Sequence, residues 1–429
     1  MITASSPHLA GVQGRARGTS VVFWIALAAA PACGSSSPPH PGACPDAADA
    51  WVSDPRYCVH VFAAGVDHAR QMAFAPNGDL FVNTGSVTVV FDDDGNGTSS
   101  DAERSTFATA PGLNHGIAFS RDGNHVYASS PNTVYRWRYT TGARKAAGAA
   151  EVVVANLPAG GHVTRTLVFD SAGRLYVSVG SATNVDVDPV QVQTRAQIRR
   201  FAIPDAVPAG GIDYATGEVV ASGMRNEVGL YMDARDRMWG VENGRDMLTD
   251  GSDIHNDNPA EEVNLIDGAG ASYYGYPSCF SEFKRPGGLG AGAQWADTTL
   301  AAGDRKTDAF CRDPARVHPP AFALPAHWAP LGILEYQGDM LPLGHDLIVA
   351  AHGSWNSDTP VGRVLARLHR DGDTITSFEP IVGERGPDNG LRQGQWGARP
   401  VDVREGPDGA VYFSDDMGGR VFKLSYTAN

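Results

Sequence analysis

The sequence has little charge, few cysteines and, after its first 33 residues, no long hydrophobic run. Only 19% of the 429 residues are charged, and 34 Lys and Arg against 48 Asp and Glu give a net charge of −14. This lack of positive charge argues against a nucleic-acid partner. No stretch after residue 33 is long and apolar enough to span a bilayer. Cys-x-x-Cys-His is absent, so a covalently attached c-type haem is not expected.

Glycine and proline are abundant, with 50 and 28 copies, and 42% of the residues are hydrophobic. This composition favours many tight turns and little long helix, around a sizeable core. We therefore predict an all-β protein. Closed all-β architectures can exceed about 200 residues as one unit, so a single large domain is compatible with this length.

Residues 1–33 are predicted to be an export signal. Two arginines precede an apolar run over residues 21–31, and a cysteine, Cys33, follows it. Residues 30–33 look like a bacterial lipoprotein cleavage site, so lipid attachment at Cys33 and ordinary cleavage both stay open. Residues 34–57 are predicted to be a polar tether and N-terminal segment. We expect the protein in the bacterial periplasm or, as a lipoprotein, anchored to a membrane and facing outside the cytoplasm.

The cysteine count agrees with export. Without Cys33, four of the five cysteines remain, and an even number can pair in an oxidising compartment. We propose the pairs Cys44 with Cys58 and Cys279 with Cys311. Unpaired buried thiols are the alternative.

Six segments share one pattern: an apolar strand, a turn rich in Asp, Asn or Gly, and a second apolar strand. They are residues 71–74 with 80–82, 116–119 with 126–128, 166–169 with 175–177, 228–231 with 238–240, 332–336 with 347–349, and 401–403 with 411–413. The turn glycines Gly78, Gly123 and Gly173 are 45 and 50 residues apart, a period that matches one four-stranded propeller blade. A long insertion, residues 271–330, precedes the fifth repeat.

A single hairpin cannot cover its own apolar face, so such repeats must stack on one another until a ring closes. Six copies predict a six-bladed β-propeller over residues 58–429. A β-sandwich with similar hairpins is the structural alternative.

One motif stands directly before the third repeat. It reads Gly160-Gly161-His162-Val163-Thr164-Arg165-Thr166. Here the chain would enter the strand that lines the central channel of a propeller, so we expect His162 to face the channel mouth. The alternative is a structural histidine that forms hydrogen bonds at the start of a strand.

Further motifs accompany this histidine along residues 58–427. They are Leu175-Tyr176-Val177-Ser178-Val179-Gly180, Gly223-Met224-Arg225-Asn226, Glu242-Asn243-Gly244-Arg245-Asp246, Glu261-Glu262-Val263-Asn264, Tyr274-Gly275-Tyr276-Pro277, Pro325-Ala326-His327-Trp328-Ala329-Pro330, Ala351-His352-Gly353-Ser354-Trp355, Arg399-Pro400-Val401-Asp402-Val403 and Ser414-Asp415-Asp416. Together they make the chain resemble the glucose/sorbosone dehydrogenase family of quinoproteins.

The resemblance implies an oxidoreductase that oxidises a sugar, or a sugar-derived aldehyde or alcohol, by hydride transfer to calcium-bound pyrroloquinoline quinone (PQQ). His162 would be the general base on the substrate hydroxyl or hydrated aldehyde. Arg165 would help to orient the substrate or His162. The electrons would then pass to an external acceptor, and we expect the protein to be a monomer.

Arginines are expected in the cofactor pocket, because PQQ carries three carboxylates and Arg suits their planar, bidentate recognition. Arg70, Arg225 and Arg399 each lie just before the first strand of a repeat, where the inner strands converge. We predict that they bind the cofactor together; surface ion pairs are the alternative for each. By the resemblance, Asn226 would hydrogen-bond the quinone and His352 would lie beside it, where some relatives have a basic residue.

The resemblance also implies that the backbone carbonyls of Gly244 and Arg245 bind calcium. This hard cation prefers oxygen ligands and would polarise the quinone carbonyl. Arg245 departs from the family pattern, since the well-known soluble glucose enzyme has a proline at this position.

A second, structural calcium site is predicted from spacing. Positions one, three, five, six and twelve of the twelve-residue calcium-loop pattern hold Asp92, Asp94, Asn96, Gly97 and Glu103. We expect an isolated loop between the first and second blades, without the usual flanking helices. A plain turn rich in Asp and Gly is the alternative.

Two other functions stay open from the residues alone. Six-bladed calcium-dependent lactonases also hold a metal in the channel, through carboxylate and Asn side chains and without an arginine cluster. A non-catalytic propeller that binds protein or glycan would not need His162, the Arg225-Asn226 pair and the Gly244 loop together.

Overall fold

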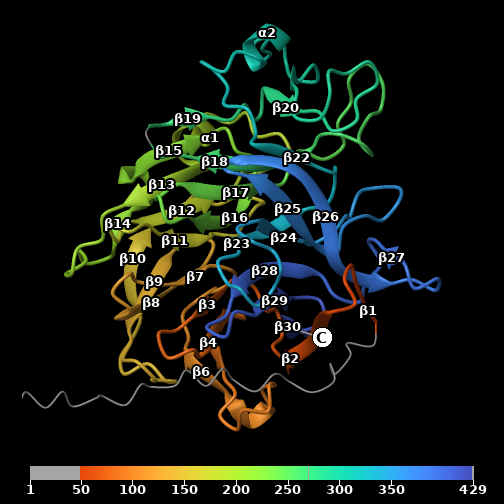
Figure 1. Ribbon diagram of the computed structural model, residues 1–429. Coiled ribbons are helices and arrows are strands. Elements are labelled where there is room, and N and C mark those ends of the chain that lie inside the picture. The colour runs from red at the N-terminus through yellow and green to blue at the C-terminus, as the bar shows by residue number, and fades with distance from the viewer. Residues whose placement is uncertain (1–48, 269, 428–429) are drawn as a thin grey trace, which may run out of the picture. The chain divides into compact units, whose positions relative to one another are not determined.

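The computed structural model describes residues 49–268 and 270–427. The predicted export signal over residues 1–33, including Cys33, and also Cys44 lie outside the described residues. The described part is almost entirely β, with six large sheets and one small hairpin (Figure 1). Each large sheet is one blade, so the prediction of an all-β, six-bladed propeller is confirmed.

The first three blades use strands that follow one another along the chain. Blade 1 contains β3 (Met72–Phe74), β4 (Leu80–Asn83), β5 (Val87–Val90) and β6 (Arg104–Ala108). Blade 2 contains β7 (Ile117–Phe119), β8 (His125–Ser129), β9 (Val134–Arg138), β10 (Glu151–Ala155) and the short β14 (Ile212–Asp213). Blade 3 contains β11 (Leu167–Phe169), β12 (Leu175–Val179), β13 (Gln197–Phe201), β15 (Glu218–Ser222) and β19 (Ser272–Tyr273).

The other three blades recruit some strands from further away. Blade 4 contains β16 (Glu227–Met232), β17 (Met238–Glu242), β18 (Glu261–Ile266) and β22 (Phe322–Leu324). Blade 5 contains β23 (Pro330–Glu335), β24 (Leu347–Ala351), β25 (Val364–Asp371) and β26 (Thr374–Arg385), with β1 (Ala50–Val52) and β27 (Leu391–Arg392) at its outer edge. Blade 6 contains β28 (Pro400–Glu405), β29 (Val411–Asp415), β30 (Arg420–Tyr426) and β2 (Tyr57–Ala64).

The first strand of each blade lies at the centre of the ring. β3, β7, β11, β16, β23 and β28 contact one another in this order, and β28 contacts β3 again. Each pairs antiparallel with the next strand of its own blade, as Leu167 opposite Val177 shows for blade 3. The six hairpins predicted from the sequence are therefore the two inner strands of the six blades.

The inner strands approach so closely that glycine is required at some positions. A Cβ on Gly332 of β23 would lie 2.7 Å from the carbonyl oxygen of Val401 and 2.8 Å from the Cα of Asp402, both in β28. A Cβ on Gly229 of β16 would lie 2.9 Å from the Cα of Gly332. Blades 4, 5 and 6 can meet at this distance only because these residues lack side chains.

The ring closes through a strand from the N-terminal part of the chain. β2 pairs antiparallel with β30, beginning with Tyr57 opposite Tyr426. β1 pairs antiparallel with β26 of blade 5. The strands of the propeller therefore begin at Ala50, ahead of the boundary that the sequence placed at residue 58, because this segment completes the edges of two blades.

Apolar side chains fill the space between neighbouring blades. Phe81 of blade 1 packs edge-on against Phe119 of blade 2, with ring centroids 5.0 Å apart. Phe413 and Phe422 of blade 6 share one buried apolar cluster with Leu334 and Ile348 of blade 5. Burial of such a side chain stabilises the fold by about 1.5–3 kcal/mol, so packing between sheets holds the blades together.

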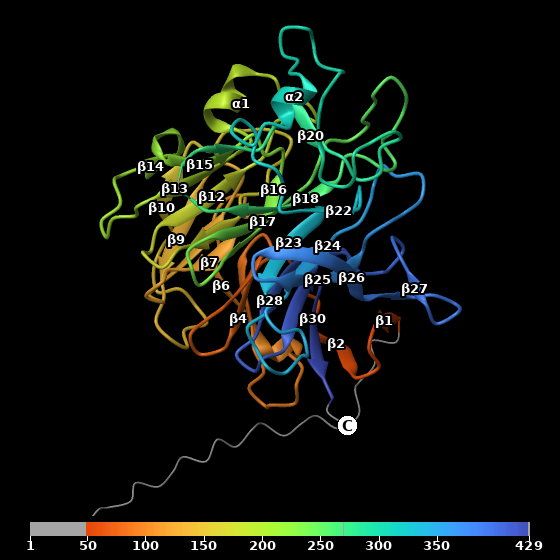
Figure 2. The same cartoon turned by 45° about the horizontal axis from the view of Figure 1, so that its top comes forward.

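Part of the long insertion forms a small unit on blade 4. It contains the hairpin β20 (Cys279–Ser281) and β21 (Gln294–Ala296), followed by α2 (Asp308–Cys311), and it projects beyond the blades (Figure 2). The predicted disulfide between Cys279 and Cys311 is present, with Cα atoms 5.7 Å apart. No helix within the described ranges has the length and apolar character needed to cross a membrane.

Candidate active site

A cavity of about 250 Å³ lies where the inner strands begin and the second strands end. Its lining comes from blades 3 to 6 and consists of His162, Arg225, Asn226, Asn243, Gly244, Asp246, Glu261, His327, Ala329, Leu331, His352, Gly353, Ser354, Trp355, Asn356 and Arg399. Propeller topology places these strand ends at one mouth of the channel. The structure thus brings together His162, Arg225, Asn226, Gly244, His352 and Arg399 of the predicted site.

His162 lies on the loop before β11. Its Nδ1 is 2.9 Å from the carbonyl oxygen of Ser181 and 3.0 Å from the Ser181 hydroxyl oxygen. If Nδ1 donates to the carbonyl, Nε2 is left as a hydrogen-bond acceptor. Burial, followed by the charge of Arg225, lowers the pKa of His162 to about 4. The ring is therefore neutral at pH 7, as a general base requires.

Arg165 is fully buried and lies outside the cavity lining. Its guanidinium donates to the carbonyl oxygens of Pro131, Pro158, His162 and Thr164. Burial lowers its pKa to about 10. Arg165 was predicted to orient either the substrate or His162. Its contacts fix the loop that carries His162, so the geometry fits the second role.

Gly180, directly after β12, lets two site residues approach each other. A Cβ at this position would lie 2.7 Å from the Cβ of His162 and 2.6 Å from Oδ1 of Asn226. Any larger residue would displace one of them. This close contact explains why the Ser178-Val179-Gly180 segment ends in glycine.

Arg225 is only 4% exposed and is held on several sides. Its guanidinium lies 2.8 Å from the Asp246 carboxylate, 3.0 Å from the side-chain oxygen of Asn184 and 3.2 Å from the carbonyl oxygen of Asn243. Its backbone N–H donates to the Glu242 carboxylate. The guanidinium is therefore rigidly placed at the cavity wall, with part of its charge compensated by Asp246.

Arg399 differs from Arg225 because its charge has no close counterion. It donates to the carbonyl oxygens of His352 and Gly353 at 3.0 and 2.8 Å. No carboxylate of the described residues lies within ion-pair distance of it. Burial, followed by the nearby charge of Arg363, lowers its pKa. An anionic ligand in the cavity would stabilise this cation.

Arg70, Asp416 and His352 form a chain of contacts behind the cavity wall. One carboxylate oxygen of Asp416 is 2.9 Å from Nε2 of His352, and the other is 2.6 Å from Nη1 of Arg70. Burial opposes ionisation of Asp416, but the contacts with His352 and Arg70 lower its pKa. Arg70 is outside the cavity lining and connects to it through Asp416 and His352. Its direct contact with a cofactor stays a prediction.

The loop after β17 brings Gly244 to the cavity. The Gly244 N–H donates to Glu261 at 2.8 Å, and the other oxygen of Glu261 accepts from the Ala329 N–H at 3.2 Å. Burial raises the pKa of Glu261 to about 8. No N–H of the described residues donates to the carbonyl oxygens of Gly244 or Arg245. Gly244 lines the main cavity and Arg245 only the smaller one described below, so calcium binding by their carbonyl oxygens stays a prediction.

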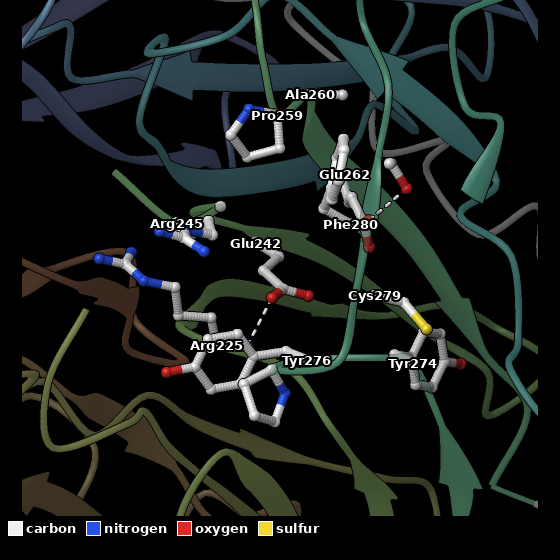
Figure 3. Close-up of a pocket in the computed structure, with 13 residues that line it drawn as sticks. Arg225, Glu242, Arg245, Pro259, Ala260, Glu262, Tyr274, Tyr276, Cys279 and Phe280 are labelled. Atoms are coloured by element: carbon white, nitrogen blue, oxygen red, sulfur yellow. Dashed lines mark hydrogen bonds between the residues drawn. The ribbon is translucent and has the colours of Figure 1, made fainter. Parts of the chain in front are cut away.

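A second cavity of about 20 Å³, room for about one water molecule, lies between blade 4 and the insertion (Figure 3). Glu242 accepts there from the backbone N–H of Arg225, and Glu262 accepts from Ser281. Burial raises the pKa of Glu262 to about 7 and that of Glu242 well above its usual range. Arg245 lines this smaller cavity. Its guanidinium contacts Asp297 and Thr299 of the insertion.

The predicted calcium loop lies elsewhere, between β5 and β6. Carboxylate oxygens of Asp92, Asp94 and Glu103 lie within 4.8 Å of one another. The N–H of Asn96 donates to Asp92 and Asp94 at 3.1 Å, and Gly97 has the positive φ of 86° that the turn needs. The expected position between blades 1 and 2 is wrong, because β6 is the fourth strand of blade 1. Calcium binding by this loop stays a prediction.

Several cavity residues received no role from the sequence. Asp246, Glu261 and His327 each belong to one of the sequence motifs, and their positions next to strand ends could have indicated a place in the site. Asn184, on the loop after β12, is outside the cavity lining and contacts Arg225, and none of the sequence motifs includes it. His327 and Ala329 also have positive φ values of 62° and 48°, and such strained backbone often occurs at functional sites.

The fold and the cavity define a six-bladed propeller with a neutral histidine and cationic side chains at one channel mouth. Residues 52–427 match the TrAA12-like protein family, and the chain belongs to this family.

Proteins of similar sequence include sugar dehydrogenases. A pyrroloquinoline quinone-dependent sugar dehydrogenase of Hypocrea jecorina is 30% identical over 409 residues, which cover 90% of each chain. A pyrroloquinoline quinone-dependent pyranose dehydrogenase of Coprinopsis cinerea is 30% identical over 348 residues, which cover 72% of this chain and 46% of the relative.

Solved structures agree with these matches. The Trichoderma reesei enzyme of carbohydrate-active family AA12 has a TM-score of 0.77 and 29% identity, covering 88% of this chain and 98% of that chain. The holo form of the pyranose dehydrogenase PQQ domain from Coprinopsis cinerea has a TM-score of 0.76 and 26% identity, covering 88% and 97%.

Proposed function

We propose that this protein is a PQQ-dependent sugar dehydrogenase. It oxidises a sugar, or a sugar-derived aldehyde or alcohol, with calcium-bound PQQ, and passes the electrons to an external acceptor. The observation that carries this proposal is the presence in one cavity of neutral His162 and of Arg399, whose guanidinium forms no ion pair with a described carboxylate. The names of the relatives from Hypocrea jecorina and Coprinopsis cinerea support it.

The cavity fits a flat tricarboxylate. Arg399 supplies an unpaired cation, Arg225 supplies a second guanidinium, and Asn226 adds an amide. Charge-assisted hydrogen bonds between guanidinium and carboxylate are about twice as strong as neutral ones. These residues would hold the cofactor, with His352 beside it.

Calcium would bind on the side of blade 4. The Gly244 and Arg245 carbonyl oxygens are unpaired oxygen donors, the ligand type that calcium prefers. Glu261 fixes the Gly244 loop against the Ala329 loop through two hydrogen bonds. These two carbonyl oxygens would be the ligands that the protein gives to the ion.

His162 accepts the substrate proton in the proposed reaction. PQQ, when bound, supplies the two-electron acceptor for hydride leaving the substrate carbon. The Ser181 contacts hold the imidazole so that Nε2 receives the proton of the substrate hydroxyl. Burial and Arg225 keep Nε2 unprotonated at pH 7, and the same influences favour release of the proton after each turnover.

We also propose that the protein acts outside the cytoplasm. The signal pattern over residues 1–33 supports export. The disulfide between Cys279 and Cys311 agrees with an oxidising compartment. The external electron acceptor would then be located outside the cytoplasm.

Cofactor binding gives the first test. Arg399→Gln should weaken PQQ binding in the presence of calcium by roughly 10- to 100-fold, because one charge-assisted contact is lost. The control is Arg235→Gln, since Arg235 is exposed and pairs with Asp373. Equal affinity of the Arg399 variant and the parent in a spectroscopic titration would contradict the cofactor assignment. A parent that binds no PQQ but hydrolyses sugar lactones would make the protein a lactonase.

A further inference from the structure

Protein oxygens occupy almost all N–H groups of the Arg225 guanidinium. A guanidinium has five N–H donors, one on Nε and two on each Nη. The Nε–H donates to the Asn184 carbonyl at 3.2 Å, and Nη2 donates to the Asn184 side-chain oxygen at 3.0 Å and to the Asp246 carboxylate at 2.8 Å. One Nη1–H donates to the Asn243 carbonyl at 3.2 Å. Among the described residues, the second Nη1–H has no acceptor. Arg225 lines the main cavity, so this N–H remains for an anionic ligand there.

Asn184 accepts two of these four hydrogen bonds and also holds Asp246. Its side-chain oxygen accepts from the Asp246 N–H at 2.7 Å, and its amide nitrogen donates to the Asp246 carbonyl at 2.8 Å. This reciprocal pair joins the loop after β12 to the loop after β17. The side chain of Asn184 therefore fixes both the arginine and the carboxylate that faces it. Because an amide is neutral, it does so without adding negative charge beside Arg225.

Tyr276 of the insertion holds the loop that carries Asn184. Its hydroxyl accepts from the Asp186 N–H at 2.7 Å and lies 3.2 Å from the carbonyl oxygen of Asn184, to which it donates. The Asp186 carboxylate is buried and accepts two hydrogen bonds of 2.7 Å from Arg195. Tyr276 and Arg225 line the smaller cavity together (Figure 3). The loop is therefore held by the insertion on one side and by Arg195 on the other.

Asn184 influences a ligand only through its neighbours. It is outside the lining of the main cavity, whereas Arg225 and Asp246 belong to that lining. The contact of the same loop with the proposed base is separate, because Ser181 makes it with Nδ1 of His162. A change at Asn184 should therefore act first on the groups that bind an anion.

We propose that Asn184 is a positioning residue for the cofactor site. It holds the Arg225 guanidinium in the orientation that leaves an Nη1–H for a carboxylate of the ligand, and Tyr276 keeps Asn184 in place. Without the Asn184 side chain, Nη2 loses one acceptor and the Asp246 backbone loses two contacts, so the guanidinium turns toward the carboxylate that remains. This inference rests on the proposed PQQ-dependent function and names the residues that prepare Arg225 for it.

Asn184→Ala should weaken PQQ binding in the presence of calcium about 10-fold or more, because the guanidinium is no longer fixed. A spectroscopic titration measures this affinity. The rate of cofactor reduction at saturating PQQ should fall less than the affinity, because the Ser181 contact with His162 remains. Asn124→Ala is the matched control and should bind PQQ like the parent. Asn124 is exposed in the turn between β7 and β8, where its amide donates to Asp122 at 2.8 Å.

Tyr276→Phe provides a second test, which also serves if Asn184→Ala does not fold. It removes one hydroxyl group that contacts the loop, so the dissociation constant for PQQ should rise about 3- to 10-fold. Tyr135→Phe is its control, since the Tyr135 hydroxyl donates to the Pro111 carbonyl on blade 2. Parent-like PQQ affinity in Asn184→Ala, or in Tyr276→Phe if the first variant does not fold, would overturn the positioning role.

A crystal structure of the cofactor-free variant separates this inference from the proposed function. In Asn184→Ala, or in Tyr276→Phe if the first variant does not fold, the Arg225 guanidinium should rotate and lose its hydrogen bond to the Asn243 carbonyl. An unmoved guanidinium would overturn the positioning role. A parent protein that binds no PQQ, together with a displaced guanidinium in the variant, would keep the positioning role and overturn the dehydrogenase function.

Discussion

At the residue scale, the proposed chemistry depends on one imidazole. Arg165 fixes the backbone of His162, Ser181 contacts Nδ1, and Gly180 leaves room for the Cβ of His162 beside Asn226. These contacts all leave Nε2 for the substrate. The role of His162 can therefore be separated from the role of the residues that hold the cofactor.

His162→Ala should lower the rate of cofactor reduction by roughly 10²- to 10⁴-fold, the usual effect of removing a positioned base. PQQ should still bind, because Arg225, Arg399 and the Gly244 carbonyl remain. Stopped-flow absorbance of the loaded variant measures the rate, and a titration measures the affinity. His345→Ala is the control, since His345 is an exposed histidine. Full activity of the His162 variant on every substrate of the parent would refute the mechanism.

The pH profile provides an independent check on the same residue. The pKa of His162 is lowered to about 4, so on acidification the imidazole stays neutral through the ordinary histidine range and gains a proton only near pH 4. The acid limb of kcat/KM, which reports the free enzyme, should therefore lie well below pH 6. An acid limb between pH 6 and 7 that disappears in His162→Ala would contradict the structural environment described for the ring.

At the element scale, the segment between β5 and β6 is separate from the active site. Its carboxylates converge at Asp92, Asp94 and Glu103, while Asp93 points elsewhere and pairs with Arg144 at 2.7 Å. A calcium ion here would tie the third strand of blade 1 to the fourth. We therefore expect it to affect stability and not turnover.

Asp94→Ala should remove most of the thermal stabilisation that calcium gives the parent, which we expect to be about 3 °C or more. PQQ affinity should stay nearly unchanged. Melting temperatures with calcium and with a chelator measure the effect. Asp93→Ala is the matched control, because it changes the same loop without removing a predicted ligand. If the parent and both variants respond equally to calcium, the loop is a plain turn.

At the scale of the whole molecule, the blades were predictable because each hairpin has a local pattern of apolar strands and turn glycines. The closure of β2 on β30 was not, because it joins distant parts of the chain and depends on no local motif. Six of the nine residues predicted for the active site, among them His162 and Arg399, line the cavity because the topology brings the strand ends together. Repeat position does not fix side-chain direction, which is why Arg70 and Arg165 lie behind the lining. The contacts of Asn184 join the loops of two blades and follow from no motif, so they required the structure.

The most direct test of the central claim is reduction of bound PQQ by sugar. The protein is loaded with PQQ and calcium, freed of oxygen and electron acceptors, and mixed with a panel of aldoses while the cofactor absorbance is followed. We predict a stoichiometric change to the spectrum of the reduced cofactor, saturable in sugar, that reverses when an acceptor is added. Tight PQQ binding with an unchanged spectrum for every sugar would contradict the proposed function.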